Sequence, residues 1–536
     1  MPRRCHGFFC GLVDAVGMNF LAKHVEQGEK LTTAQQHKSA RLVMAFALTA
    51  LLVGCGGGGG GGESANAGGA PQSPPTGSVP SSNPVPAGFE PITTLAKQAV
   101  ANAKYFVQTI KATLSDEVVI ALPATIAVGG TVVVKGDTDI RWKLAQNAGQ
   151  TIGTRALPGG VEPGLAFSPQ QSSTQNWWFV ASSASGQKLA AVANNFVGLQ
   201  APNSSASSGS VWTSADAGAT WTERTAPGNE PWSSIASSAD GTKLVAVGIG
   251  TQIWTSGDSG ATWQARETNR SWDSVTMSAD GSRVAAATLE ATSGGNNGRI
   301  HTLAQAPGAA FGAGTWVEQI ESQMWRSIAS SSDGRKLVAA AYQEVQGTQQ
   351  SGVFTSEDYG VTWTRRITTA GSAYRVTSSA DGTRLAMVER FGKIYTSANS
   401  GATWSAGTSE GGFNSVASSA DGSVLVAVQA NGKSTVEDQS VLVGRTGKLL
   451  VSTNAGTTWT ERATRNWWRG AAVSADGNRL VGAVNVGQMY VSTSNRSSYG
   501  ITGSITGGQT NELTLRYLGD GLFDVTSAAG AGYVTR

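Results

Sequence analysis

A pattern of apolar and polar positions recurs along the chain at intervals of 40 to 55 residues. Each copy begins with an aromatic residue, reaches Ile or Val three positions later, passes through Ser-Ala-Asp-Gly and ends in a Lys/Arg-Leu-Val-Ala run. Two apolar runs around a glycine turn predict a β-hairpin, because glycine reaches the positive φ that tight turns need. The turn aspartates are Asp240, Asp280, Asp333, Asp381, Asp421 and Asp476, and a weaker first copy has Ser185 in this place.

A second phrase, Ser-x-Asp-x-Gly-x-Thr-Trp, falls between these copies. It is complete around Asp216, Asp258 and Asp358, and asparagine replaces the aspartate at Asn399 and Asn454. The third unit keeps only the Gly-Thr-Trp end, and the seventh has nearly lost the phrase. An Asp or Asn side chain that accepts backbone N–H groups shapes a turn. We therefore expect these five residues to be structural, and each unit to contain four strands.

The second phrase resembles the Asp-box, or BNR, repeat of sialidases, sortilin-type receptors, xyloglucanases and the photosystem II assembly factor. The resemblance covers roughly residues 170–500. Together with the repeat count it implies an all-β chain whose residues 166–499 form a seven-bladed β-propeller of four-stranded blades. The tryptophans of such blades pack between neighbouring sheets.

Composition agrees with a β-rich fold and excludes other classes. Only 14% of residues are charged, and the chain has 69 Gly and 16 Trp. These values argue against a helical bundle, a coiled coil or an acidic disordered protein. The formal net charge is +3, and the whole excess lies before Cys55. Because the remainder is neutral, the sequence indicates no nucleic-acid partner.

An apolar run from Leu42 to Val53 follows Lys38 and Arg41 and ends in Leu-Val-Gly-Cys55. A basic region, a short apolar segment and a small residue before cysteine predict an export signal. The ending resembles the lipobox of bacterial lipoproteins, which implies that residues 1–54 are removed and that Cys55 is diacylated. Gly56, in place of aspartate, favours the outer membrane, at its periplasmic face or at the cell surface. The alternative is an ordinary signal peptide with a chance cysteine.

Cleavage before Cys55 would leave one cysteine and one histidine, His301. We therefore expect no internal disulfide, no Cys/His zinc site, no cofactor and no His-based catalytic triad. His301 aligns with aromatic or apolar residues of the other repeats, which favours a packing role over a ligand or a base.

The segments beside the propeller have their own patterns. Residues 55–90 are rich in Gly, Pro and Ser and predict a disordered tether. Residues 91–165 predict a β segment, although 92–114 also fits a helix. Residues 500–536 predict a second β segment that pairs with 115–155, so that one small β-domain would hold the propeller as an insertion. The alternative is two separate caps.

The aromatic residue that opens each first hairpin is the main candidate for ligand binding. Because the first strand of a blade is innermost, these residues would form a ring near one mouth of the channel. The ring would either pack between blades or offer a stacking surface for sugars or partner side chains. Burial between the blades would exclude the stacking surface. The candidates are Trp177, Trp232, Trp272, Trp325, Phe413 and Trp468.

Enzyme activity is the weaker expectation. A group of arginines falls in the fourth and fifth repeats, but the segment around Arg375 lacks the proline of the sialidase Arg motif, and no Tyr–Glu nucleophile pair is recognisable. A glycosidase could still use a carboxylate pair that only the fold brings together. The arginines are Arg365, Arg366, Arg375, Arg384 and Arg390, and the available carboxylates include Asp273, Glu318, Glu321 and Glu344.

These features together predict a lipid-anchored envelope protein whose propeller is a non-catalytic binding or assembly platform. We expect a membrane attachment through diacylglyceryl-Cys55 and a protein partner in the envelope, and a glycan is a further possibility. The alternatives are an exported carbohydrate-active enzyme of sialidase-like fold and a glycan-binding lectin.

Overall fold

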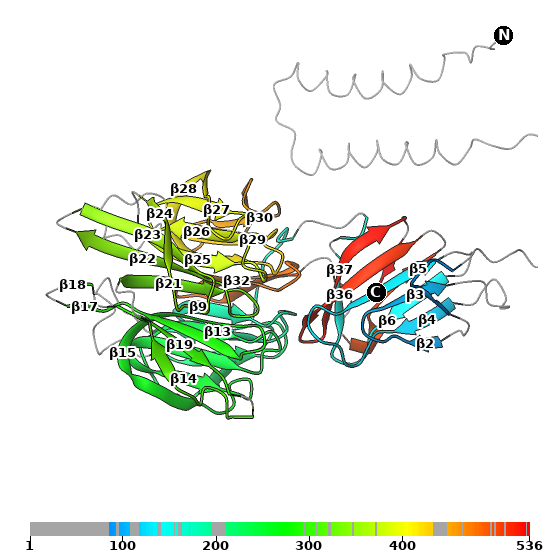
Figure 1. The fold of residues 1–536 in the computed structure, drawn as a ribbon, viewed down its shortest axis with the longest axis horizontal. Coiled ribbons are helices and arrows are strands. Elements are labelled where there is room, and N and C mark those ends of the chain that lie inside the picture. Colours follow the sequence, from blue (N-terminus) through cyan, green and yellow to red (C-terminus); the bar gives the residue numbers. More distant parts are fainter. Residues whose placement is uncertain are drawn as a thin grey trace, which may run out of the picture. The chain divides into compact units, whose positions relative to one another are not determined.

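The computed structural model describes the chain from Val85 to Arg536 with gaps, the longest of which are 108–116, 195–208 and 432–446. The expected signal peptide, Cys55 and most of the tether lie outside the described residues. In the described part the regular structure is β-strand apart from one 3-10 turn, Gly500–Thr502 (Figure 1). No helix in that part is long and apolar enough to cross a membrane.

The repeats form a β-propeller, and five hydrogen-bonded sheets make it up. The first sheet contains β9 (Trp177–Ser182), β10 (Leu189–Ala193), β11 (Val211–Ser214) and β12 (Thr222–Arg224). The second contains β13 (Trp232–Ser237), β14 (Leu244–Ser256), β15 (Gln264–Met277), β16 (Arg283–Thr288), β19 (Ile300–Ala304) and β20 (Trp316–Glu318). It spans two sequence repeats, because β15 begins in one repeat and ends in the next. The short hairpin of β17 (Ala291–Thr292) and β18 (Gly295–Asn296) lies between β16 and β19 in the chain.

The other three sheets contain the strands of the remaining repeats. One contains β21 (Met324–Ser330), β22 (Leu337–Val345), β23 (Thr348–Ser356) and β24 (Thr364–Thr369). The next contains β25 (Ala373–Ser378), β26 (Leu385–Glu389), β27 (Gly392–Ser397), β28 (Ser405–Ser418), β29 (Leu425–Asn431), β30 (Leu449–Ser452) and β31 (Thr460–Glu461). The last contains β32 (Trp468–Val473), β33 (Arg479–Val484), β34 (Met489–Thr493) and β8 (Ser168–Pro169).

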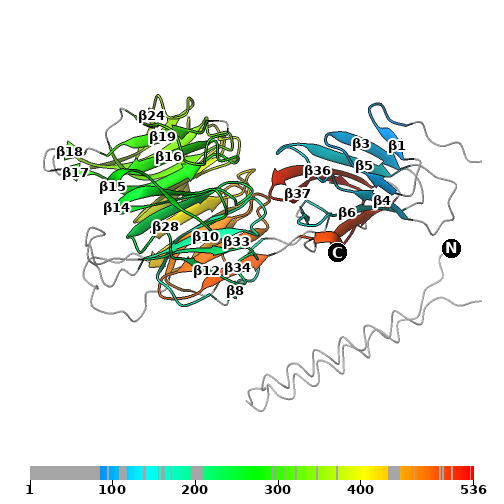
Figure 2. The same ribbon diagram turned by 90° about the horizontal axis from the view of Figure 1, so that it is seen from below.

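The last sheet joins the two ends of the propeller. Strand β8, which precedes the first repeat, pairs antiparallel with β34 through Val491↔Ser168 and Tyr490↔Pro169 (Figure 2). Phe167 beside β8 packs against the apolar cluster of β29 and β33. The propeller is therefore closed by strand pairing and by side-chain packing.

The inner strands contact one another in a closed cycle, in the order β9, β13, β15, β21, β25, β28, β32 and again β9. A ring of backbone hydrogen bonds follows the same cycle at the Ser-Ala-Asp-Gly turns. In each turn the residue before the aspartate donates its N–H to the carbonyl of the matching residue in the next turn, at 2.7–2.9 Å. We call it the turn ring. Its members are Ala184, Ala239, Ala279, Ser332, Ala380, Ala420 and Ala475.

The segments before and after the propeller form a β-domain with two sheets. One contains β1 (Glu90–Ile92), β3 (Ala103–Val107), β5 (Thr131–Gly136), β36 (Glu512–Gly519), β37 (Leu522–Ala529) and β7 (Thr151–Gly153). The other contains β2 (Ala96–Gln98), β4 (Glu117–Ala121), β6 (Arg141–Ala145), β35 (Ser504–Gly507) and β38 (Val534–Thr535). From β1 to β7 the chain alternates between the sheets. One core lies between them and includes Tyr105, Trp142 and Phe523.

Strands from the two chain ends lie side by side in the β-domain (Figure 1). Strand β36 pairs antiparallel with β5, and β35 pairs antiparallel with β6. Strand β37 pairs with β7 in parallel. The helical alternative for 92–114 is wrong for the described part of that segment, which contains β2 and β3. The physical reason is that Tyr105 and Val107 are β-formers whose side chains are buried in the domain core.

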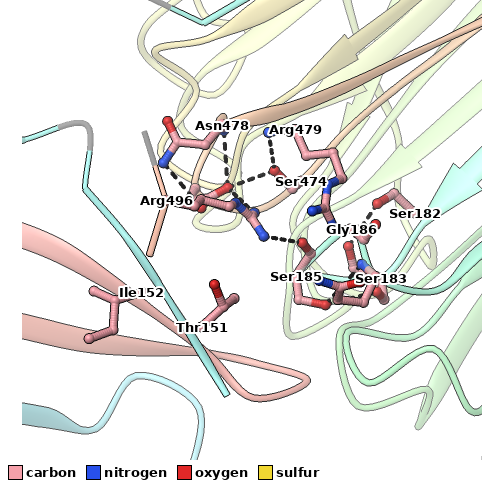
Figure 3. A network of polar contacts seen from close by, with 12 residues as sticks. Thr151, Ile152, Ser182, Ser183, Ser185, Gly186, Ser474, Asn478, Arg479 and Arg496 are labelled. Carbon is pink, nitrogen blue, oxygen red and sulfur yellow. Dashed lines mark hydrogen bonds and ion pairs between the residues drawn. The ribbon is translucent and has the colours of Figure 1, made fainter. Parts of the chain in front are cut away.

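A polar network connects the β-domain to the propeller (Figure 3). The Arg496 guanidinium lies 2.5 Å from Asp476 Oδ1 and also donates to the Ser185 carbonyl. The next residue, Ser497, exchanges hydrogen bonds with Ile152 of β7. Asp520, in the turn between β36 and β37, accepts a hydrogen bond from Ser185 Oγ. The contact therefore involves the turns at one end of the inner strands.

Candidate binding surface at the inner strands

The predicted stacking ring is wrong, because none of its side chains reaches solvent. All six aromatic residues are 0% exposed, and they are Trp177, Trp232, Trp272, Trp325, Phe413 and Trp468. Four of them, Trp177, Trp272, Trp325 and Trp468, form edge-to-face pairs with a ring of the third strand of their own repeat, as Trp325 does with Phe354 at 5.2 Å. They hold the sheets together and cannot stack on a ligand.

Register shifts explain why other residues face the centre instead. In β13, β15, β21, β25 and β32 the pairing slips directly after the first residue of the repeat. Such a bulge places two residues opposite one and re-aims the next side chain. The residues one and two positions after the aromatic are therefore the candidates for binding at the inner strands. The bulge has no simple sequence signal, which is why the pattern pointed to the aromatic itself.

Serine is common at the second of these positions, and it connects neighbouring inner strands. Ser234 Oγ accepts the N–H of Val275 at 3.3 Å, and Ser327 Oγ accepts that of Val376 at 3.1 Å. In β25 the same position holds Arg375. The arginine side chain has no acceptor for a backbone N–H of the neighbouring strand, and it extends to other strands instead.

Arg375 connects β25 with three other inner strands. Its guanidinium lies 3.4 Å from Asp273 Oδ2 of β15 and donates to the carbonyl of Arg326 in β21. It lies 6.0 Å from the ring centre of Phe179 in β9. The residue is only 5% exposed. A charge this deeply buried requires a partner, and Asp273 supplies it.

Tyr374 is surrounded by positive charge. The guanidinium of Arg375 lies 4.8 Å and that of Arg390 lies 5.5 Å from its ring centre. Burial raises the pKa of the Tyr374 hydroxyl, but the charges of Arg375, Arg390 and Arg326 outweigh burial and hold the pKa below its usual value. A lowered pKa of the half-buried Tyr374 indicates a positive potential around it.

A second arginine–aromatic group adjoins the first. Arg469 lies 4.5 Å from the ring of Trp178 and 5.3 Å from that of Trp467. Trp178 and Phe179 are consecutive, so Arg469 and Arg375 act on neighbouring side chains of β9. We call the set the arginine–aromatic cluster, and its residues are Trp178, Phe179, Asp273, Arg326, Tyr374, Arg375, Arg390, Trp467 and Arg469.

The cluster has the chemistry of an anion site. It contains four arginines and one carboxylate, and Trp178, Phe179, Tyr374, Trp467 and Arg469 are only half-buried. A guanidinium that stacks on an aromatic ring retains N–H donors in its plane, and these can hold a carboxylate. The cluster could therefore bind a ligand that combines negative charge with apolar surface.

The arginines singled out in the sequence only partly come together. Arg375 and Arg390 meet at Tyr374. Arg365 lies over Phe354, and Arg366 donates to Thr355 Oγ1 at 2.7 Å. Arg384 donates to the Asp421 carbonyl at a turn. Arg469, which the sequence analysis did not select, belongs to the cluster.

The two candidate carboxylates whose side chains the structure describes, Asp273 and Glu318, do not form a pair. Asp273 lies on inner strand β15, and Glu318 lies on outer strand β20, with β16 and β19 between them. Glu318 lies 3.6 Å from Arg270 and 3.5 Å from Arg299. Glu321 and the side chain of Glu344 lie outside the described part of the structure.

His301 packs inside its sheet, 2% exposed and 5.0 Å from the ring of Trp272. Burial, followed by the charge of Arg270, lowers its pKa to about 4, so it is neutral at pH 7. Among the described residues, no three or more His, Cys, Asp or Glu side chains are grouped so as to hold a metal ion.

The Asp-box residues build turns through their own side chains. Asp216 accepts from Ser214 Oγ at 2.8 Å, from Thr220 N at 2.9 Å and from Thr220 Oγ1 at 2.6 Å. Asp258 and Asp358 repeat this pattern.

At Asn399 and Asn454 one hydrogen bond is reversed, because the amide donates to Oγ1 of Thr403 or Thr458. The Asn side chain is therefore more than an acceptor. The threonine hydroxyl is a donor to Asp and an acceptor from Asn, which is why both residues fit the turn.

The comparisons with known proteins found similar chains among solved structures. No family model matches this chain, and no curated protein matches it. Similar structures include YCF48 bound to a D1 peptide (16% identical, covering 63% of this chain and 99% of that chain, TM-score 0.42). They also include YCF48 from Cyanidioschyzon merolae (14%, 61% and 98%, TM-score 0.43) and the β-propeller domain of Cps50 (Swd1) from Myceliophteria thermophila (11%, 61% and 99%, TM-score 0.41).

Proposed function

We propose that this chain is a non-catalytic binding platform whose arginine–aromatic cluster holds an acidic segment of a protein partner. The observation that carries the proposal is the convergence of Arg326, Arg375 and Arg390 on Tyr374, where their charge lowers the tyrosine pKa against the effect of burial. Half-buried Trp178 and Trp467 add apolar surface beside Arg469. Aromatic and arginine side chains are enriched among residues that dominate protein interfaces.

The cluster supports binding rather than hydrolysis. A glycosidase needs two carboxyl groups on opposite sides of the scissile bond. The cluster contains one, Asp273, and Arg375 neutralises it.

We also infer that the propeller has seven blades. The inner strands that contact one another in a cycle number seven, and the turn ring contains seven backbone hydrogen bonds. Two of the five sheets span two repeats each, because β15 and β28 begin in one repeat and end in the next, so these sheets support the same count. Selective proline substitution at one turn-ring donor, Ala380→Pro, should disrupt the propeller if the ring closes it.

The membrane attachment is a separate proposal. We propose that Cys55 carries a diacylglyceryl group in a bacterial outer membrane and that residues 55–90 tether the propeller to it. The support is the Leu-Val-Gly-Cys ending of the apolar run and Gly56 after it. Labelling of cells with a clickable palmitate should mark the wild-type protein, and Cys55→Ser should abolish the label. A labelled Cys55→Ser protein would contradict the anchor.

A direct binding measurement tests the cluster. The probe is a fluorescein-labelled hexaglutamate peptide, followed by fluorescence anisotropy with the full chain at low and physiological salt. We expect Arg390→Gln and Arg469→Gln each to weaken binding at least fivefold. Arg365→Gln is the matched control, because Arg365 also lies over an aromatic ring, that of Phe354, but outside the cluster.

Two outcomes would contradict the proposed function. Equal affinity of all three variants for hexaglutamate would place the binding elsewhere. Binding of an acidic oligosaccharide such as oligogalacturonate, without binding of the peptide, would reassign the cluster to a glycan ligand.

A further inference from the structure

The grooves between neighbouring repeats at the turn ring have a common arrangement in most of the turns. A basic residue stands three positions after the turn Asp, or after Ser185, in every turn but that of Asp421, where the residue is Val424. In several turns its charged end is held by the backbone of the next turn. Lys188 Nζ donates to the Asp240 carbonyl at 2.8 Å, Lys243 Nζ to the Asp280 carbonyl at 2.5 Å, and Arg384 Nη1 to the Asp421 carbonyl at 3.3 Å. The repeat thus fixes a cation at the floor of several grooves.

In two grooves the chain places its own aromatic ring on this cation. Tyr359 of one Asp-box lies over Arg283, with 4.3 Å between the guanidinium carbon and the ring centre. Phe311 lies 5.8 Å from Lys243 Nζ. Both are cation–π contacts, which favour an aromatic ring over an aliphatic side chain of similar size.

The two rings come from matching places in their repeats. Tyr359 precedes Gly360, and Phe311 precedes Gly312. In each case the glycine lies against a threonine of the preceding repeat, Thr255 for Gly312 and Thr302 for Gly360. The residue before the turn glycine therefore decides what covers the groove.

Elsewhere this residue is small, and two of the grooves are hollow. Ala455 takes the place over Arg384, where a cavity of about 450 Å³ is lined by Arg384, Leu385, Thr396 and Leu425. Ser259 takes the place over Lys188, where the cavity has about 210 Å³.

A third groove is filled by its own residues. Lys336 Nζ bonds to Ser400 Oγ at 3.2 Å. The cavity beside this pair has only about 10 Å³. The groove over Arg384 is the larger of the two hollow ones.

We propose that the groove over Arg384 is a docking pocket for a phenylalanine or tyrosine side chain of a protein partner. The ring would stack on the Arg384 guanidinium as Tyr359 stacks on Arg283. Leu385 and Leu425 supply apolar contact for its edges, and the Asp421 carbonyl holds the guanidinium in place beforehand. A cation already fixed in position reduces the entropy lost on binding.

This pocket is distinct from the arginine–aromatic cluster. Strand β25 begins beside the cluster with Ala373 and ends at Ser378, next to the turn of Asp381 that carries Arg384. The pocket and the cluster therefore lie at opposite ends of the same inner strand. The docking pocket does not depend on the proposed function of the cluster, and either can fail alone.

The test uses the full chain and the probe N-acetyl-4-fluorophenylalanine amide, followed by ¹⁹F NMR line broadening. We expect Ala455→Tyr to close the pocket and to lower probe binding at least tenfold. Position 455 already has φ of 56°, close to the 64° at which Tyr359 is accommodated, so the variant should fold. A thermal melt checks this point. Arg384→Gln keeps much of the side-chain volume and should weaken binding several-fold.

A reciprocal variant gives the matched control. Tyr359→Ala should open the equivalent groove over Arg283 and add a second binding site for the probe. N-acetyl-cyclohexylalanine amide, which has the bulk without the aromatic face, should compete poorly. The proposal is overturned if the wild-type chain does not broaden the probe signal, if Ala455→Tyr binds it as well as wild type does, or if Tyr359→Ala gains no site.

Discussion

Arg375 shows how one residue can give a repeated scaffold an individual site. Four of the other inner strands have serine at its position, namely Ser234, Ser274, Ser327 and Ser415. The sequence shows this replacement, but it cannot show that the side chain extends to β15. That outcome depends on the bulge after Ala373 and on the closure of the inner strands into a cycle. The sequence therefore marks Arg375 as a departure from the repeat, but it does not show which residues gather around it.

Restoring serine at this position should destabilise the fold. Arg375→Ser leaves the Asp273 carboxylate buried without its partner, and we expect a loss of roughly 3–5 kcal/mol in the free energy of unfolding. Guanidinium denaturation measures the loss. The double variant Arg375→Ser/Asp273→Ser should recover most of it, because no charge is then left buried. If the double variant is no more stable than the single one, the ion pair is not the cause.

The Asp-box side chains allow a second test at this scale. Asp216→Ala removes three hydrogen bonds inside the turn, and we expect a loss of about 1–3 kcal/mol in the free energy of unfolding. Asp216→Asn should cost much less, because Asn399 and Asn454 make the same turn with one reversed hydrogen bond. Equal losses in the two variants would show that the negative charge, and not the hydrogen-bond pattern, is what the turn requires.

His301 should make stability depend on pH below neutrality. Its folded-state pKa of about 4 lies below the ordinary value of 6.5, so the unfolded chain binds the proton first. The contribution is complete above pH 6.5 and is lost as pH falls toward 4, by at most about 3 kcal/mol. His301→Phe, which copies Phe354 of the next sheet, should flatten this part of the curve in denaturation at stepped pH. An unchanged curve would contradict the assignment.

The turn carboxylates act in a lower pH range. Burial raises their pKa values, but hydrogen bonds from serine and threonine hydroxyls and from backbone N–H groups outweigh it, so the pKa values are lowered. Their contribution is complete above about pH 4 and is lost as pH falls through the lowered values. The effect of His301 can therefore be measured separately.

At the scale of the elements, the repeats were the most predictable part. Hairpins around Asp240 to Asp476 and turns at the Asp-boxes follow from local alternation and from glycine. Strand β8 does not, because Ser168 and Pro169 have no apolar pattern and become a strand only by pairing with β34. The short strands β1 to β3 are also hard to predict, because each pairs with a strand that comes later in the chain. Strand β1 pairs with β3, β2 with β4, and β3 with β5. Non-local pairing is the part that the sequence pattern could not supply.

A disulfide can test the closure of the propeller by β8. Ser168 and Val491 are cross-strand neighbours, so Ser168→Cys/Val491→Cys would place two cysteines opposite each other, with Cys5, Cys10 and Cys55 replaced by serine so that no other bridge can form. We expect the oxidised protein to exceed its own reduced form by about 2–4 kcal/mol in unfolding free energy. Equal stability of the two forms would mean that the strand ends are not held together during unfolding. The reduced form controls for the loss of Val491.

At the scale of the whole molecule, the turn ring both closes the propeller and receives the β-domain. A Cβ on Gly519 would lie 3.0 Å from the Ala239 Cβ, so the turn after β36 approaches the ring closely. Burial raises the pKa of Asp520 in the same turn. Its ionised form is therefore disfavoured there, and the contribution to stability is lost as pH rises through the raised pKa.

Arg496 should control the contact between the β-domain and the propeller. Its partner Asp476 has a fully buried side chain, so Arg496→Gln removes the direct ion pair and leaves Arg479 as the remaining positive charge that interacts with Asp476. We expect faster hydrogen exchange at the Ser497 amide, which donates to Ile152 of β7, with the propeller strands unaffected. Arg496→Lys keeps the charge and is the matched control. Its exchange rate at the Ser497 amide should lie between those of the wild type and Arg496→Gln. Unchanged exchange at Ser497 would show that other contacts fix the β-domain.

The pairing of β5 with β36 also has a consequence for biosynthesis. Val134 meets Leu513, a residue that the ribosome adds about 380 residues later. The β-domain therefore cannot complete its sheets while the chain is still being made, and its early strands must wait with their apolar faces uncovered. A prematurely terminated chain would display the unpaired edges of β5 and β6 to proteases.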